Sequence, residues 1–211
     1  MNAFPVVFSK KKSSLRQYGR IVTVIGLFLF LAGVSLSAYV IYAVADNNFH
    51  VIVPREVYRS SQMNGEQLAR CINTYRIKSV LNLRGTNSTR IWYQDEIVTA
   101  SQFNVAHYDW SFGACDELSV QKMDELIGLL RSLPKPLLIH CQGGADRTGL
   151  ASALYCYAVE KQKPQIADRQ LTIWDGHMPL YWLKEQAMDN SFWRYVSNNV
   201  RQITFEQTPT E

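Results

Sequence analysis

The sequence contains few cysteines and histidines, and these residues form no common metal-binding spacing. Its 211 residues include 4 of each type. They form none of the CxxC, HxH and HExxH spacings that are typical of zinc sites and dithiol redox centres. The sequence therefore gives no indication of a metal centre.

Acidic residues are absent from the first 20 positions, which hold five basic side chains. The rest of the chain holds 17 basic and 18 acidic side chains, so the formal net charge of +4 comes from the N-terminus. Since nucleic-acid-binding domains are usually basic, we expect no nucleic-acid partner. Hydrophobic residues make up 47% of the chain, which excludes a wholly disordered or collagen-like protein.

Charged residues are also absent from residues 21–45, IVTVIGLFLFLAGVSLSAYVIYAVA. A helix of this length reaches about 37 Å, enough to cross a hydrocarbon core of about 30 Å. We therefore predict three parts, which are a basic cytoplasmic tail at 1–20, a single transmembrane anchor at 21–45 and a folded domain at 46–211. Such a domain has an ordinary size for one compact unit.

The orientation of this anchor follows from the basic residues beside it. They precede the apolar run, and none lies between Asp46 and Pro54. Because basic residues favour the cytoplasmic side, we expect the folded domain to be periplasmic or otherwise extracytoplasmic. The alternative is a cleaved signal peptide, since Ala43-Val44-Ala45 before Asp46 fits a cleavage site. The apolar run exceeds the usual signal-peptide core of about 7–15 residues, which favours an uncleaved anchor.

Short apolar runs alternate with amphipathic stretches in the folded domain. Asn64 and Ser119 are placed to cap helices, and Pro134 and Pro136 end the second of these. Further helices are predicted at 91–103, 148–160, 165–174 and 181–200, and strands at 79–83, 105–110 and 137–140. This alternation predicts the α/β class, with a mostly parallel central sheet flanked by helices.

The segment with the clearest chemistry is residues 140–149, HCQGGADRTG, which leaves an apolar strand and opens a helix. Backbone N–H groups at such a helix start bind anions, and a phosphate fits there. Arg147 can donate two parallel hydrogen bonds to phosphate oxygens. The N–H groups, His140 and Arg147 favour the nucleophilic thiolate form of Cys141. Thr148 can donate its hydroxyl proton to that sulfur.

This segment resembles the signature of the cysteine-dependent protein tyrosine and dual-specificity phosphatases, HCx5R followed by Ser or Thr. Residues 58–62, 77–84, 92–96 and 167–171 are similar to segments of small bacterial atypical dual-specificity phosphatases. The likeness covers roughly residues 55–180. It implies a phosphatase-type catalytic domain at 46–211, a phosphocysteine intermediate and no metal or other cofactor. It also implies that the phosphate is bound by the loop residues Gln142, Gly143, Gly144, Ala145 and Asp146.

The resemblance requires a general acid, for which three aspartates are candidates. Asp109 lies 32 residues before Cys141, a spacing similar to that of several dual-specificity phosphatases, but it falls in a predicted strand. Asp116 lies where a loop carrying the acid is expected. Asp146 is in the signature itself, and a similar GxDRT sequence in myotubularin-like lipid phosphatases suggests an acid there. We rank Asp116 and Asp109 nearly level and Asp146 third.

The substrate is less clearly indicated than the chemistry. The loop interior contains no lysine and one acidic residue, so it favours a single phosphate over a highly phosphorylated ligand. A phosphoprotein carrying phosphotyrosine, phosphoserine or phosphothreonine is the first candidate. A phospholipid or lipid-linked phosphate at the membrane is the second, and a catalytically inactive phosphate-binding module is the third.

Several other residues have weaker signals. Arg59, Arg84 and Arg169 could supply charge near the pocket or have structural or solvated roles. We predict that Cys71 and Cys156 are small core residues. The helical spacing of four tryptophans also predicts core packing for Trp92, Trp174, Trp182 and Trp193.

Overall fold

The computed structural model describes residues 11–177 and 186–206, which form two separate units divided after Ala45. The first unit is the helix α1 (Lys11–Ala45). Its stretch Gln17–Tyr39 has 23 residues, a mean hydropathy of 2.4 and no buried positions. These properties suit a membrane span, and they also suit a signal sequence, so this helix fits both alternatives drawn from the sequence.

The second unit is built on a five-stranded sheet in the order β1-β2-β5-β3-β4. Its strands are β1 (His50–Val53), β2 (Val57–Ser60), β3 (Ser79–Asn82), β4 (Ala106–Asp109) and β5 (Leu137–His140). β1 pairs with β2 in the antiparallel direction, and all other pairs are parallel. The predicted α/β class with a mostly parallel sheet is therefore confirmed, and the strand that leads to Cys141 is its central strand.

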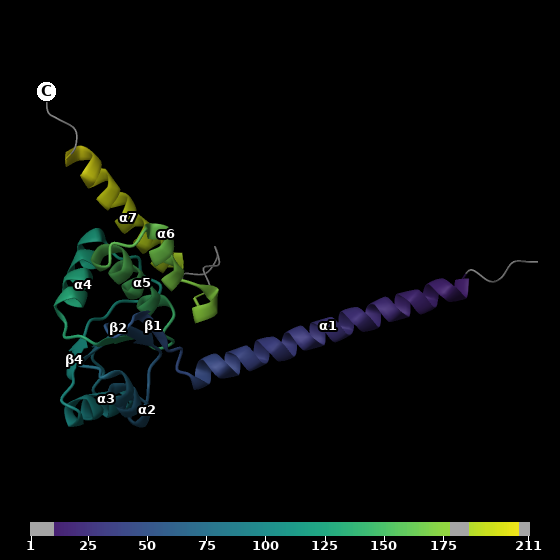
Figure 1. Ribbon diagram of the computed structural model, residues 1–211, viewed down its shortest axis with the longest axis horizontal. Helices are drawn as coiled ribbons and strands as arrows, with labels where there is room; N and C mark the ends of the chain where they lie inside the picture. The colour runs from purple at the N-terminus through teal and green to yellow at the C-terminus, as the bar shows by residue number, and fades with distance from the viewer. Residues whose placement is uncertain (1–10, 178–185, 207–211) are drawn as a thin grey trace, which may run out of the picture. The chain divides into compact units, whose positions relative to one another are not determined.

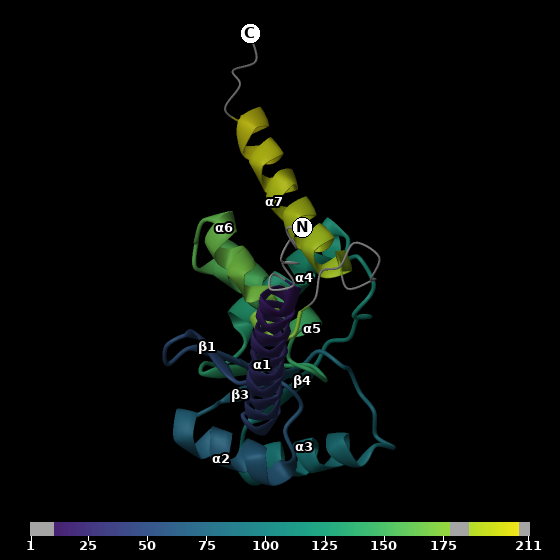
Figure 2. The same cartoon turned by 90° about the vertical axis from the view of Figure 1, so that its right-hand side faces the viewer.

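Helices cover both faces of this sheet (Figures 1 and 2). One layer contains α2 (Gly65–Tyr75) and α3 (Ile91–Gln102). The other contains α4 (Val120–Ser132), α5 (Asp146–Leu154), the π-helical turn η1 (Tyr155–Val159) and α7 (Ala187–Glu206). Because side chains of a strand alternate between faces, Leu137 and Ile139 of β5 pack in the second layer's core, while Leu138 packs in the first.

Two of the predicted helix starts are capped as the sequence indicates. Asn64 accepts a hydrogen bond from the backbone of Gln67, whose side chain accepts one from the backbone of Asn64. Ser119 accepts a hydrogen bond from the backbone N–H of Lys122 at the start of α4. The contacts at Asn64 and Gln67 are reciprocal, and each cap satisfies N–H groups that a helix start leaves without partners.

The predicted helix at 165–174 is wrong. The chain there forms the short helix α6 (Pro164–Ala167) and two 3-10 turns, η2 (Asp168–Gln170) and η3 (Ile173–Asp175). One reason is that the carbonyl of Gln170 accepts a hydrogen bond of 2.7 Å from Arg59, so it does not continue a helix. The helix predicted at 148–160 is α5 continued by η1, and that predicted at 181–200 corresponds to α7 from Ala187 onwards. Residues 178–185 lie outside the described residues.

The predicted burial is confirmed for the two cysteines and is wrong for two of the tryptophans. Cys71 and Cys156 are buried. Trp174 is 67% exposed and Trp193 is 37% exposed, so these two do not pack in the core as predicted. Trp92 is half-buried, and Trp182 lies outside the described residues.

Candidate active site

Three strands deliver the candidate site to one edge of the sheet. His140, the last residue of β5, pairs with Ser60 of β2 and with Asn82 of β3. Parallel strands end at the same edge, so the residues that follow them lie side by side, as is usual for ligand sites in α/β sheets. The segments brought together are 61–62, 83–84 and the signature loop, which we define as residues 141–147.

The signature loop turns tightly between β5 and α5. Cys141 is 3% exposed, and its Sγ accepts a hydrogen bond from the N–H of Gly144 at 3.3 Å. Gly144 has a φ of +71°, and a Cβ atom there would lie 2.6–2.7 Å from backbone atoms of Ser60 and Ser61. This position therefore requires glycine because of both its conformation and its closeness to β2.

Four successive carbonyl groups of the loop are held by residues outside it. Gln142 O accepts from the backbone N–H of Gln62 at 3.1 Å, and Gly143 O accepts from Asn48 Nδ2 at 3.0 Å. The carbonyls of Gly144 and Ala145 accept from Arg59 Nη2 at 2.7 and 3.4 Å.

This arrangement fixes the direction of the loop's N–H groups. In a trans peptide the C=O and N–H groups point in opposite directions. Because the four carbonyls are held from outside, the N–H groups that follow them, from Gly143 to Asp146, point to the other side of the loop. The N–H of Gly144 shows this direction, since it donates to Cys141 Sγ. The loop is thus a cradle for an anion, built around the thiol.

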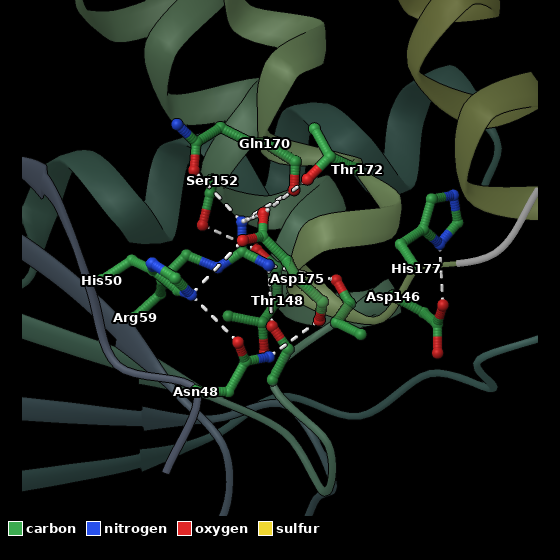
Figure 3. Close-up of polar contacts among 12 residues, drawn as sticks. Asn48, His50, Arg59, Asp146, Thr148, Ser152, Gln170, Thr172, Asp175 and His177 are labelled. Atoms are coloured by element: carbon green, nitrogen blue, oxygen red, sulfur yellow. Dashed lines mark hydrogen bonds and ion pairs between the residues drawn. The ribbon is translucent and has the colours of Figure 1, made fainter. Parts of the chain in front are cut away.

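Arg59 holds two of the four carbonyls, more than any other residue (Figure 3), and it is fully buried. Besides the two loop carbonyls, it donates to Gln170 O at 2.7 Å and lies 3.3 Å from Asp175 Oδ2. Burial lowers the pKa of Arg59, and the charge of Asp175 opposes that shift. Arg59 therefore has the structural role that the sequence left open, and it lies behind the loop instead of facing a ligand.

Arg147 and Thr148 lie where the loop enters α5. Arg147 Nη1 donates to the carbonyl of Leu83 at 3.2 Å, and its Nε is buried without a hydrogen-bond partner among the described residues. The Thr148 hydroxyl is also buried, and within the same residues it has no partner. Both side chains thus keep donors without partners beside the loop, and their roles toward a bound phosphate stay predictions.

His140 belongs to a buried network that sequence reasoning did not assemble. Its Nε2 lies 3.1 Å from Glu96 Oε1, which also contacts His107 Nε2 at 2.7 Å. Gln62 Nε2 donates to the other oxygen of Glu96 at 2.5 Å. Burial alone would raise the pKa of Glu96, but the charge of His140 and these hydrogen bonds outweigh it, so the pKa lies well below its usual value. Glu96 is therefore an ionised anchor for His140.

The three candidate acids have different surroundings. Asp109, at the end of β4, accepts hydrogen bonds from Tyr93 at 2.5 Å, Asn82 at 2.8 Å and Thr86 at 3.1 Å. Asp116 is exposed on the loop between β4 and α4, and its side chain makes no hydrogen bond within the described part of the chain.

The third candidate, Asp146, is paired with a histidine. Its Oδ1 lies 2.7 Å from Nδ1 of the fully buried His177, whose Nε2 lies 2.8 Å from Asp189 Oδ2 (the Asp146 contact is drawn in Figure 3). Burial alone would lower the pKa of His177, but hydrogen bonds to the two carboxylates and their charges raise it to about 9. Asp146 therefore accepts a hydrogen bond from a charged imidazole. Through its second contact, with Asp189 of α7, His177 connects the signature loop to that helix.

Arg84 and Arg169 complete the set of arginines considered from the sequence. Arg84 follows β3, two residues beyond the pairing of Asn82 with His140, and its Nη1 donates to Gln62 Oε1 at 3.0 Å. Arg169 is exposed in η2. The structure thus places Arg84 at the edge of the sheet that carries the site.

The fold and the loop together define a cysteine-based phosphatase domain, and comparisons with known proteins agree. A family model described as "Swiss Army Knife protein, DSP-PTPase phosphatase domain" matches residues 46–195. The chain therefore belongs to this family of dual-specificity and tyrosine phosphatase-like domains. None of the curated proteins compared with the chain matches it.

Solved structures share the fold at low sequence identity. P. aeruginosa TpbA in complex with pTyr aligns with a TM-score of 0.56 and 19% identity, covering 69% of this chain and 83% of TpbA. The core catalytic domain of the PP-IP phosphatase SIW14 from S. cerevisiae aligns with a TM-score of 0.56 and 17% identity, covering 75% and 91%. PTPMT1 aligns with a TM-score of 0.53 and 13% identity, covering 72% and 99%. These matches establish the phosphatase-type fold.

We predict that His177 makes the stability of the domain depend on pH. Since its folded-state pKa is raised to about 9, its stabilisation is complete below the unfolded value of about 6.5 and is lost as the pH rises through about 9. Between about pH 7 and 9.5, the Tm of the unchanged protein should fall by several degrees more than that of His177→Gln, a difference on the order of 1–2 kcal/mol.

Thermal unfolding across this pH range checks the prediction, and His50→Gln is the matched control. His50 also lies near an aspartate, Asp175, but it is exposed, so solvent screens that pair and this variant should keep the slope of the unchanged protein. Equal slopes in the unchanged protein and His177→Gln would contradict the assignment of a charged His177.

Proposed function

We propose that this domain is a phosphomonoesterase that acts through a phosphocysteine intermediate on Cys141. The observation that carries the proposal is the set of four outward-held carbonyls, which leaves the loop's N–H groups around the cysteine sulfur. N–H groups fixed in this way stabilise the negative charge of a transferring phosphoryl group without rearrangement. The Cys141 sulfur accepts a hydrogen bond from the Gly144 N–H, which places it beside the bound phosphate as the nucleophile.

In the first step the Cys141 sulfur attacks the phosphorus, an S–P bond forms and the bond from phosphorus to the leaving oxygen breaks. Arg147 binds the equatorial phosphate oxygens, together with the N–H groups of residues 142–147, and stabilises the transition state. A general acid gives the leaving oxygen its proton. In the second step the same acid group, now deprotonated, takes a proton from a water molecule whose oxygen attacks phosphorus. The S–P bond breaks, inorganic phosphate leaves, and the Thr148 hydroxyl donates a hydrogen bond to the departing thiolate sulfur.

We assign the general acid to Asp116. Its carboxyl is exposed and makes no hydrogen bond with the described residues, so it is available to a leaving group. Asp109 accepts three hydrogen bonds from neighbouring side chains, so its oxygens are already occupied within the protein. Asp146 Oδ1 lies 2.7 Å from Nδ1 of the charged His177, so this carboxylate already has a partner within the protein.

The first test of this function is the nucleophile. The full chain should release p-nitrophenol from p-nitrophenyl phosphate, with a pre-steady-state burst when substrate is in excess and breakdown of the phosphocysteine is the slower step. Cys141→Ser should lose at least about 1,000-fold in kcat because a serine hydroxyl lacks the thiolate's nucleophilicity. A variant that hydrolyses the substrate like the unchanged protein would contradict the mechanism, and an inert unchanged protein would instead support the phosphate-binding module.

The second test separates the acids by their pH profiles. Asp116→Asn should lower kcat by about 100-fold or more and remove the basic limb of the profile, because the leaving oxygen then receives no proton from the enzyme. Asp109→Asn and Asp146→Asn should keep that limb. If Asp116→Asn keeps it and another variant loses it, the assignment passes to that other residue.

The proposed location is the membrane, with residues 21–45 of α1 as a single uncleaved span, a basic cytoplasmic tail at 1–20 and the catalytic domain on the extracytoplasmic side. The apolar stretch Gln17–Tyr39 and the basic residues before it support this proposal. A phosphate group carried by a molecule at the same membrane surface is then the natural substrate.

Two classes of substrate meet this requirement. A phosphoprotein is supported by the resemblance to dual-specificity phosphatases and by the fold shared with TpbA, whose structure contains pTyr. A phospholipid is favoured by one contact, the hydrogen bond from Asn48 to Gly143 of the signature loop. Only Asp46 and Asn47 separate Asn48 from the end of α1, and three residues of chain extend at most about 11 Å. Through so short a tether, a membrane-spanning α1 keeps the folded domain at the membrane surface, where phospholipids are present.

A spacer between Ala45 and Asp46 tests whether the substrate is a phospholipid. Inserting about 20 Gly and Ser residues adds a flexible tether of about 25 Å. The longer tether lowers the effective concentration of the active site at the lipid surface. Hydrolysis of phosphatidylglycerophosphate in vesicles should fall about tenfold, while hydrolysis of p-nitrophenyl phosphate should stay within about twofold.

The same preparation supplies its own control for the anchor. N-terminal sequencing of the membrane-isolated protein should give Met1, whereas an N-terminus at Asp46 would show that the anchor is removed by cleavage. Unchanged lipid hydrolysis in the spacer variant, together with faster hydrolysis of a phosphotyrosine peptide, would assign the phosphoprotein class.

A further inference from the structure

Arg84 occupies a place beside the signature loop that the phosphatase chemistry does not use. The preceding residue, Leu83, donates its N–H to His140 O at 2.9 Å and accepts from Arg147 Nη1 through its carbonyl. Gln62, which accepts from Arg84 Nη1, donates its own N–H to Gln142 O of the loop. Arg84 is thus linked to the loop from both sides, and its backbone lies next to the group that Arg147 contacts.

The guanidinium of Arg84 is held in place by neutral groups. Its Cζ lies 3.5 Å from the centroid of the Trp92 ring, which fixes the plane of the guanidinium. Its one side-chain hydrogen bond in the described structure goes to the neutral amide of Gln62. Its remaining N–H donors are left for a ligand.

Neither Arg84 nor Arg147 forms an ion pair with a carboxylate among residues 11–177 and 186–206. Burial lowers the pKa of Arg84, and the charge of Arg147 lowers it further, while Cys141 opposes that shift. The charge of Glu96 opposes the shift too, but this buried carboxylate is hydrogen-bonded to two histidines and to Gln62. The loop's one acidic residue, Asp146, is paired with His177. The two guanidinium groups, which repel each other, therefore have no carboxylate partner of their own in the described structure, and an anionic ligand supplies the missing negative charge.

We propose that Arg84 binds a second phosphate group of the substrate, next to the phosphomonoester that Arg147 and the loop hold. This inference rests on the proposed function and narrows its substrate class. The sequence alone favoured one phosphate because the loop has no second cation, but Arg84 supplies that cation from the end of β3.

Phosphate is the group that this arrangement fits best. A planar guanidinium fixed by stacking presents parallel N–H donors, which match two oxygens of a phosphate. Since Arg84 follows the residue that Arg147 contacts, the two phosphates are joined by a short linker. A terminal phosphomonoester beside a phosphodiester, as in a phosphorylated phospholipid headgroup, has this chemistry, and a small soluble bisphosphate has it too.

Matched substrates that differ by one phosphate test the inference on the full chain in detergent micelles. The soluble pair is 1,3-propanediol bisphosphate and 3-hydroxypropyl phosphate, and the lipid pair is phosphatidylglycerophosphate and phosphatidic acid. We expect kcat/KM to be about tenfold higher for the two-phosphate member of at least one pair. A preference in the soluble pair assigns the phosphate itself as the feature recognised, and a preference in the lipid pair alone assigns the headgroup as its source.

Variants connect this preference to Arg84. Arg84→Gln should lose about tenfold or more on the two-phosphate substrate and less than about threefold on its one-phosphate partner. Arg84→Lys keeps the charge but lacks the planar donor pair, so it should retain part of the preference. Arg90→Gln is the control, because Arg90 is exposed, carries the same charge and makes no side-chain hydrogen bond at the start of α3. It should keep the full preference.

The inference fails if neither pair shows a preference, if Arg84→Gln loses activity equally on both members, or if Arg90→Gln has the same effect. A preference only for phosphotyrosine peptides with neighbouring glutamates would also overturn it. Hydrolysis of p-nitrophenyl phosphate distinguishes these results from failure of the proposed function, because a protein without the phosphatase chemistry would not hydrolyse that substrate at all.

Discussion

The direction of four carbonyl groups is the constraint on which the candidate active site depends. A free loop of glycine and alanine would present C=O and N–H groups on both sides, and its carbonyls would repel a phosphate. Here the carbonyls of residues 142–145 are bound from behind by Gln62, Asn48 and Arg59. These hydrogen bonds offset the conformational entropy that the loop loses when it is ordered. The N–H groups then converge on Cys141 before any ligand arrives. Gly144 allows this because no other residue fits so close to β2.

The buried charged side chains of this domain mainly position parts of the candidate active site. Arg59, Glu96 and His177 are almost fully buried, and each makes hydrogen bonds to several partners. Replacing such groups by apolar ones often stabilises a protein, so stability alone does not explain them. Each instead holds one part of the site, since Arg59 fixes the loop, Glu96 fixes His140 and His177 fixes the start of α5. By contrast, the five basic residues of the N-terminal segment are the charges that suit a role in membrane topology.

Local sequence signals predicted much of this architecture. The apolar run of β5, the caps at Asn64 and Ser119, and the signature at 140–149 all act within a few residues, so one sequence shows them. The supports of the loop could not be read in this way. Asn48 and Arg59 lie 95 and 85 positions from the carbonyls that they bind, and β2, which carries Arg59, is only four residues long. The prediction of a helix at 165–174 was wrong for the same reason, since the Gln170 carbonyl there accepts a hydrogen bond from Arg59, which is distant in the sequence.

The affinity of the loop for an anion is the most direct test of its preformed cradle. Tungstate binding, measured by calorimetry, should weaken about 100-fold in Arg59→Met, because the carbonyls of Gly144 and Ala145 lose their charged donor. Asn48→Ala releases one carbonyl without removing a buried charge, so it should keep the fold and weaken binding about tenfold. Circular dichroism verifies that each variant is folded. Folded variants that bind tungstate as tightly as the unchanged protein would contradict the account.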